Sequence, residues 1–254
     1  LAAFSAEAAP ITTDTLGLEA HEVRIALKDG TFLPAYAARP AGAGRYPVVV
    51  VICEVFGVHE YIRDTCRRLA KLGYAAVAPA FFFRAGDPAP LKDFDEIKKI
   101  VATATNEQVM GDIDASLTWL ADQKWADRKR LAITGFCWGG SPVWMSSARF
   151  PEFHAGVAWY GRLAVANPGE AMSAEKRQWP VDVAGQLHAP VLGLYAGQDK
   201  GITPESIEQM RAAIRAAGGT SQIVVYPDAQ HGFHADYRPT YNEAAARDGV
   251  AVYD

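Results

Sequence analysis

Residues 133–142 read Ile-Thr-Gly-Phe-Cys-Trp-Gly-Gly-Ser-Pro. They contain the pattern G-x-C-x-G, with a short apolar run leading into Cys137 and small residues leading out toward a helix. A side chain on a sharp strand-to-helix turn strains the backbone, and the flanking Gly135 and Gly139 lack the bulk that would prevent the turn. The helix dipole would favour a thiolate at its N-terminus. We therefore interpret Cys137 as a nucleophile on an elbow; a buried structural cysteine is the alternative.

The composition is that of a globular protein. The chain has 254 residues, 50% hydrophobic and 21% charged, with a formal net charge of −4. A nucleic-acid partner would usually require a basic surface, so none is expected. The longest apolar run, residues 47–53, is far too short to span a membrane, so no membrane partner is expected either.

The cysteines and the N-terminal residues bear on compartment and domain organisation. Cys53, Cys66 and Cys137 show no C-x-x-C spacing and cannot all pair, so a disulfide scaffold is not expected. A free nucleophilic thiol is typical of a reducing compartment, which favours the cytoplasm. The Ala-rich stretch Leu1–Pro10 could instead be the remnant of a signal peptide, which would favour the periplasm. We predict a weakly ordered arm over residues 1–20 and a single domain over residues 21–254.

The body of the chain alternates strand-like and helix-like segments. Alternating runs at 22–27 and 31–38 flank an Asp-Gly pair and predict a hairpin. Apolar runs typical of buried strands then alternate with helical patterns. The later strands are predicted at 46–53, 74–79, 131–135, 154–160, 190–195 and 222–226, and the helices at 61–72, 106–125, 140–149 and 204–217. Repeated strand–helix units predict an α/β fold with a mostly parallel sheet and helices on both faces.

Two more reactive side chains follow predicted strands, where functional groups gather in an open α/β sheet. Asp199 comes after the strand at 190–195, and His231 after the strand at 222–226. The order Cys137, Asp199, His231 is that of nucleophile, acid and base in α/β-hydrolases. We predict that the sulfur attacks a carbonyl carbon, that the imidazole shuttles the proton, and that the carboxylate fixes the imidazole.

Other interpretations of the acid and the base are open at this point. Asp199 could form an Asx turn before Gly201. Asp228 is a competing acid, although it lies only three residues from His231 on the same loop. His231 could be a surface histidine.

Backbone N–H groups should stabilise the negative charge that develops on the carbonyl oxygen. One belongs to Trp138, and the other should come from the loop after an earlier strand, where Val55 is the candidate. Glu54 ends that buried strand, where a carboxylate is costly without a partner. Either Glu54 pairs with Arg63 or Arg84, or it serves the nucleophilic thiol as a second base or hydrogen-bond partner.

The clearest motifs are Glu54-Val55-Phe56-Gly57-Val58-His59 and Gly135-Phe136-Cys137-Trp138-Gly139-Gly140, followed by Trp159-Tyr160-Gly161, Gly197-Gln198-Asp199 and His231-Gly232-Phe233. Together these motifs resemble the dienelactone hydrolase (carboxymethylenebutenolidase) family of the α/β-hydrolase superfamily, over about residues 20 to 240. The resemblance implies an eight-stranded α/β-hydrolase sheet and a small ester or lactone substrate. It also implies no metal or organic cofactor, and a monomer or small homo-oligomer is expected. It assigns the triad to Cys137, His231 and Asp199, and gives Glu54 the task of holding and then deprotonating the thiol.

The resemblance also implies substrate contacts. Arg84 matches a family arginine that binds the substrate carboxylate, and Tyr160 matches a tyrosine that lines the pocket. The family carries a second arginine soon after the catalytic histidine, where this chain has Ala235. His234 or Arg238 could substitute, although neither is in register. The candidate substrate-binding residues are therefore Arg84, Tyr160, His234 and Phe56.

Other functions are weighed against this one. A non-catalytic or regulatory binding module could keep the same pocket, and a thioesterase or a redox-active thiol protein could use the same cysteine. Zinc chemistry is not expected, because Arg63 stands where His59-Glu60 would need a second histidine. A Rossmann cofactor site is not expected either, because no G-x-G-x-x-G opens the first strand–helix unit.

Overall fold

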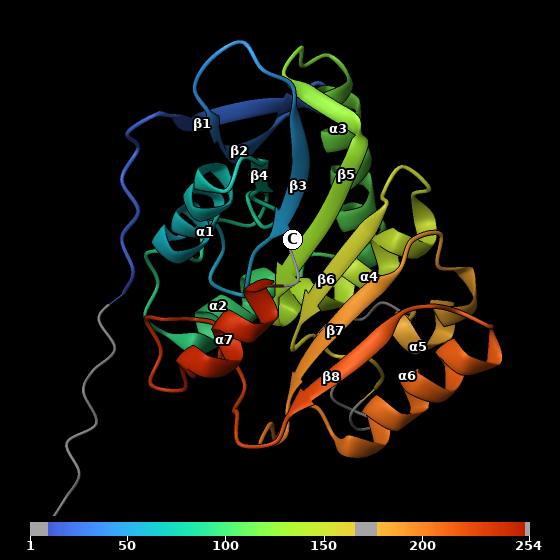
Figure 1. Ribbon diagram of the computed structural model, residues 1–254. Helices are drawn as coiled ribbons and strands as arrows, with labels where there is room; N and C mark the ends of the chain where they lie inside the picture. The colour runs from blue at the N-terminus through green and yellow to red at the C-terminus, as the bar shows by residue number, and fades with distance from the viewer. Residues whose placement is uncertain (1–9, 166–176, 252–254) are drawn as a thin grey trace, which may run out of the picture.

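A computed structural model describes residues 10–165 and 177–251, which build an eight-stranded sheet with helices on both faces (Figure 1). The strands lie in the order β1-β2-β4-β3-β5-β6-β7-β8. The pairs β1–β2 and β2–β4 are antiparallel, and the remaining pairs are parallel. Helices α1 and α7 lie on one face of the sheet, and α3 and α4 on the other. The predicted fold class is confirmed.

The element bounds follow the predicted alternation closely. The strands are β1 (Leu18–Ala26), β2 (Phe32–Pro40), β3 (Tyr46–Ile52), β4 (Ala75–Pro79), β5 (Ala126–Phe136), β6 (Ala155–Trp159), β7 (Val191–Ala196) and β8 (Gln222–Tyr226). The α-helices are α1 (Glu60–Lys71), α2 (Phe94–Val101), α3 (Asn106–Ala121), α4 (Gly140–Arg149), α5 (Pro180–Val183), α6 (Pro204–Ala216) and α7 (Glu243–Val250). The Asp-Gly pair joins β1 and β2, as its hairpin signal predicts.

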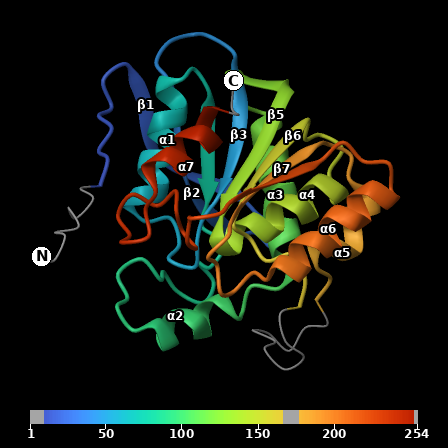
Figure 2. The same ribbon diagram turned by 60° about the horizontal axis from the view of Figure 1, so that its bottom comes forward.

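Helix α2 is one of the elements that the sequence pattern does not predict. The Asp93 side chain caps it by accepting a hydrogen bond from the backbone N–H of Asp95 at 2.8 Å. The stretch that precedes this eight-residue helix is rich in Gly and Pro, which is typical of a loop. Figure 2 shows α2 at the end of the sheet where the parallel strands finish.

The register of the central strands brings the predicted functional residues to one edge. Ile52 of β3 pairs with Gly135 of β5, and Phe136 of β5 pairs with Trp159 of β6. The strands β3, β5 and β6 therefore finish side by side. The residues that follow them, including Glu54 and Cys137, share this edge of the sheet. The core beneath is apolar: residues 48–52 are at most 1% exposed.

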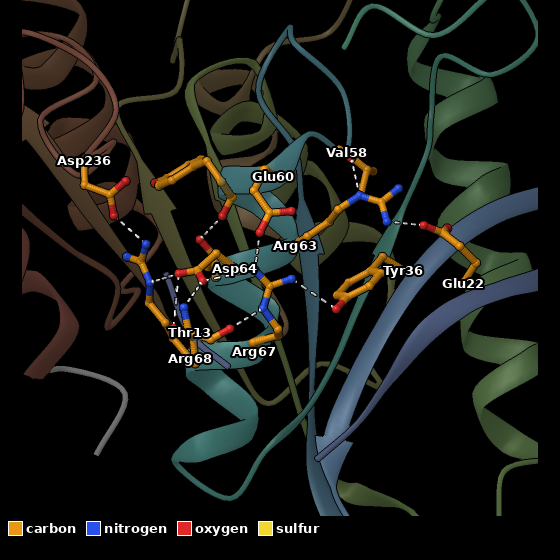
Figure 3. A network of polar contacts seen from close by, with 12 residues as sticks. Thr13, Glu22, Tyr36, Val58, Glu60, Arg63, Asp64, Arg67, Arg68 and Asp236 are labelled. Carbon is orange, nitrogen blue, oxygen red and sulfur yellow. Dashed lines mark hydrogen bonds and ion pairs between the residues drawn. The ribbon is translucent and has the colours of Figure 1, made fainter. Parts of the chain in front are cut away.

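A polar network holds the N-terminal segment to α1 and to the loop after β8 (Figure 3). Asp64 of α1 is buried and accepts hydrogen bonds from the Thr13 backbone and from Arg68. Arg68 also pairs with Asp236, a few residues beyond His231. Strand β1 begins at Leu18, inside the arm predicted over residues 1–20, and residues 1–9 lie outside the described part of the chain.

Candidate active site

Strand β5 ends at the elbow that the G-x-C-x-G pattern predicts. The backbone φ of Cys137 is 55°, in the left-handed region that side chains disfavour at a cost of order 1–3 kcal/mol. A Cβ on Gly135 would lie 2.3 Å from the carbonyl oxygen of Gly139, and a Cβ on Gly139 would lie 2.6 Å from the carbonyl oxygen of Cys53. The turn therefore closes only with glycine at both positions.

The late loops bring an imidazole and a carboxylate to the sulfur. His231 Nε2 lies 3.1 Å from Cys137 Sγ, and His231 Nδ1 lies 2.6 Å from Asp199 Oδ2. Asp199 Oδ1 also accepts a hydrogen bond from the Gly201 backbone at 2.8 Å, so the Asx turn and the contact with His231 coexist. The structure thus brings the three predicted triad residues into one continuous chain of contacts.

The surroundings of His231 favour its protonated form. Burial by itself lowers the pKa of this imidazole, but the hydrogen bonds to Asp199 and Cys137 outweigh burial and raise the pKa to about 10. At neutral pH the ring therefore carries both protons. One N–H is donated to the Asp199 carboxylate and the other to the Cys137 sulfur. An imidazolium at this distance stabilises negative charge on sulfur.

A cavity of about 780 Å³ opens above the sulfur. Val55 and Trp138, the predicted sources of the oxyanion N–H groups, line it together with Cys137. Tyr160 lines it as well; its ring lies 5.1 Å from the ring of His231, and its backbone φ is 39°. The volume is typical of a small-molecule site.

Glu54 is fully buried, and three side chains hold its carboxylate. Its Oε2 accepts a hydrogen bond from the Tyr237 hydroxyl at 2.8 Å and lies 3.1 Å from His59 Nε2. Its Oε1 lies 3.6 Å from the Arg238 guanidinium. The pairing with Arg63 or Arg84, one of the two alternatives for Glu54, is not formed: Arg63 pairs with Glu22, and Arg84 with Asp112.

Tyr237 was missed by the sequence reasoning, and Arg238 was considered only as a substitute for another arginine. Burial, with the Glu54 charge beside it, raises the pKa of the Tyr237 hydroxyl, which therefore stays protonated and donates to Glu54. Arg238 lines the cavity, and the Glu54 charge raises its pKa against the opposing effect of burial. Their position could have marked both residues as members of the site, because they follow His231 by six and seven residues on the same loop.

Arg84, which the resemblance implies binds the substrate carboxylate, is held in this structure by a carboxylate of the protein itself. Its guanidinium donates two hydrogen bonds to the buried Asp112 carboxylate, at 2.9 and 2.7 Å, and lies 4.5 Å from the centre of the Phe83 ring. It is absent from the described lining of the cavity. Burial of Asp112 explains the difference, because a carboxylate in that position requires a bidentate partner.

His234 and Phe56 also lie outside the described lining of the cavity. His234 is 5% exposed, packs 4.4 Å from the Trp159 ring, and forms a 2.6 Å hydrogen bond with the Tyr61 hydroxyl. Burial lowers the pKa of His234 to about 3, so its imidazole is neutral at pH 7. Phe56 lies with its ring 5.8 Å from the Arg238 guanidinium. In the described structure both side chains therefore make contacts within the protein, and their role toward substrate stays a prediction.

Two further findings concern metals and membranes. The residues 10–165 and 177–251 contain no group of three or more His, Cys, Asp or Glu side chains that could hold a metal ion. Across the same described ranges, no helix is both long enough and apolar enough to cross a bilayer.

The sheet order, the elbow at the end of a central strand and the late carboxylate and imidazole define an α/β-hydrolase. The model of the dienelactone hydrolase family matches residues 33–252. The chain belongs to the dienelactone hydrolase family.

The relatives extend this assignment over most of the chain. A Methylorubrum extorquens protein named as a proposed carboxymethylenebutenolidase is 50% identical over 240 residues, covering 94% of this chain and 80% of the relative. An Escherichia coli protein with the same name is 50% identical over 222 residues, covering 87% of this chain and 80% of that protein. The crystal structure of a proposed dienelactone hydrolase from Klebsiella pneumoniae is 45% identical and superposes with a TM-score of 0.85, covering 93% of this chain and 96% of that one.

Proposed function

We propose that this protein hydrolyses carboxylic esters or lactones through an acyl-cysteine intermediate. The observation that carries the proposal is the chain of contacts from Asp199 through His231 to Cys137, at the floor of a cavity of about 780 Å³. A nucleophile, a proton shuttle and an orienting carboxylate in this geometry are the requirements of covalent acyl transfer. Membership of the dienelactone hydrolase family supports the same reaction class.

The proposed reaction has two halves. In the first, Cys137 Sγ attacks the carbonyl carbon, and the C–O bond to the leaving group breaks as His231 Nε2–H gives its proton to the departing oxygen. In the second, a water molecule attacks the acyl-cysteine while neutral His231 takes a proton from it, and the C–S bond then breaks, which releases the carboxylic acid and returns the sulfur to its contact with protonated His231. Asp199 supports the positive charge on the imidazole in both halves.

The oxyanion formed in each half requires two hydrogen-bond donors. The backbone N–H groups of Val55 and Trp138 are our candidates, because both residues line the cavity that contains the sulfur. Losing one such donor typically costs about 3 kcal/mol of transition-state stabilisation.

We assign Glu54 a positioning role toward Arg238. Among the described contacts, its carboxylate reaches Tyr237, His59 and Arg238, whereas the Cys137 sulfur contacts His231. Arg238 lines the cavity, and Glu54 holds its guanidinium from behind. We propose that Arg238, in place of Arg84, contacts an anionic group on the substrate when one is present.

A pair of cysteine variants tests the proposed function. Cys137→Ala should abolish hydrolysis of phenyl acetate, because no other described thiol lines the cavity. Cys66→Ala is the matched control: Cys66 is fully buried in α1, where burial raises the pKa of its thiol, and this variant should keep its activity. Retained hydrolysis in Cys137→Ala would overturn the proposal.

We also propose a reducing compartment, the cytoplasm, and a monomer or small homo-oligomer. All three cysteines are free thiols, and the proposed mechanism requires that Cys137 stay reduced. Thiol titration of the purified protein and size-exclusion chromatography with light scattering test these two points.

A further inference from the structure

The cavity continues well beyond the triad, along a wall of apolar side chains. This wall comes from the four helices α2, α3, α4 and α5. Its residues are Phe94 at the start of α2, Val109 of α3, Pro142 and Met145 of α4, and Pro180 of α5 with the preceding Trp179. Helices α3 and α4 pack together, and α4 packs against α5, which explains how these residues meet. We call this surface the apolar wall.

Part of the apolar wall is exposed to solvent. Phe94 is 54% exposed, whereas Ile97 and Val101 of the same helix are 2% exposed. Val165, which lines the same cavity, is 55% exposed. Large apolar side chains that gather around one hollow mark a binding surface, whereas single ones such as Leu72, directly after α1, are ordinary.

The segment that carries Trp179 is fixed in place by hydrogen bonds. Arg177 donates to the backbone carbonyl of Ala104, and the Asn106 side chain donates to the backbone carbonyl of Gln178, both at 3.0 Å. The Trp179 backbone N–H donates to the Asp182 carboxylate at 2.8 Å. These hydrogen bonds fix the Trp179 segment beside the start of α3 before any substrate binds. Less conformational entropy is then lost when substrate binds against the apolar wall.

We propose that the substrate carries a bulky aromatic group that binds against the apolar wall; this inference rests on the proposed ester hydrolysis. A small ester or lactone would occupy only the end of the cavity with Cys137 and Val55, and it would leave Trp179 and Phe94 uncovered. An aryl or arylalkyl substituent fills that space and removes apolar surface from water. The specificity of the enzyme is then set by the apolar wall, at a distance from the reacting bond.

The test compares esters that differ only in this substituent. Methyl acetate is paired with methyl 3-phenylpropanoate for the acyl side, and ethyl acetate with 2-phenylethyl acetate for the alcohol side. Rates are followed by pH-stat titration and divided by the rate of hydroxide-catalysed hydrolysis of each ester. We expect kcat/KM to rise roughly tenfold or more for the aromatic member of one pair, and the pair that responds identifies the side of the ester that faces the wall.

Three variants locate the effect. Trp179→Ala and Phe94→Ala should lower kcat/KM for the aromatic esters much more than for the small esters, chiefly by raising KM, and so remove most of the aromatic preference. Leu72→Ala, which removes an equally exposed side chain on another face, should behave as the unaltered protein. If Trp179→Ala does not fold, Phe94→Ala carries the test, since its side chain is more than half exposed.

The outcomes separate this inference from the proposed function. The inference alone is overturned if Cys137-dependent turnover of the small esters is found but the aromatic esters are not preferred. It is also overturned if they are preferred and both Trp179→Ala and Phe94→Ala keep that preference. Turnover that survives Cys137→Ala would overturn the proposed function itself.

Discussion

Replacing Arg84 by alanine separates a structural arginine from a substrate-binding one. In the structure both oxygens of the Asp112 carboxylate accept hydrogen bonds from Arg84, at 2.9 and 2.7 Å. Asp112 is 1% exposed, and burial raises the pKa of its carboxyl against the opposing effect of Arg84. Arg84→Ala therefore leaves a buried carboxylate without its partner.

The expected loss of stability follows from this burial. Removing one member of a buried ion pair costs about 3–5 kcal/mol, because the other charge is left uncompensated. The Arg84 side chain is 34% exposed, so water can replace part of its contact, and we expect a loss nearer about 2–3 kcal/mol. The double variant Arg84→Met with Asp112→Leu removes both charges and should recover most of the loss.

Two measurements decide the matter. Urea unfolding at pH 7 should show the midpoint falling in Arg84→Ala and recovering in the double variant. The ratio of kcat/KM for a carboxylate-bearing ester to that for its neutral counterpart should stay constant in Arg84→Ala, and should fall in Arg238→Ala. The reasoning is refuted if Arg84→Ala lowers that ratio while the unfolding midpoint does not move.

Three further perturbations test other parts of the structure. The His231 pKa of about 10 lies above the unfolded value of about 6.5, so the stability that its contact with Asp199 contributes is complete below pH 6.5 and is lost as the pH rises toward 10. The difference in unfolding free energy between the unaltered protein and His231→Gln should therefore shrink between about pH 6.5 and pH 10. A difference that stays constant over this range would count against the contact. The pKa of His234 is shifted in the opposite direction, to about 3, so stability is lost as the pH falls from about 6.5 toward 3, at up to about 1.4 kcal/mol per pH unit. In His234→Gln the unfolding free energy should therefore fall less steeply over this acidic range. An unchanged slope would contradict a buried, neutral imidazole. Gly135→Ala would place a Cβ 2.3 Å from the Gly139 oxygen, so we expect at least about 1–3 kcal/mol of destabilisation and loss of ester hydrolysis; a stable, active variant would show that the elbow tolerates a side chain there.

The sequence predicts the catalytic centre well, because the glycine positions and the order of the residues along the chain both constrain it. The glycines around Cys137 predict the elbow because only glycine fits the contacts that close it. Asp199 and His231 follow consecutive parallel strands, and such strands finish at a common edge, so their meeting with Cys137 was predictable.

The partners of buried charges were much less predictable. Nothing local to Arg84 indicates Asp112, which lies 28 residues away on the buried face of α3. Glu54 is 183 residues from Tyr237, and that contact depends on how the loop after β8 folds back over the sheet. Long-range pairing of side chains depends on tertiary packing, which the periodicity of a sequence does not encode.

The central claim is that Cys137 forms a covalent acyl-enzyme, and intact-protein mass spectrometry tests it most directly. The protein is mixed with a slowly deacylating aryl ester, quenched in acid within the first turnover, and digested to locate the added mass. The account predicts one acyl group, on the peptide that contains Cys137, and none in Cys137→Ala. An acyl group on Cys53 or Cys66, or ester turnover with no acylated peptide at any quench time, would contradict it.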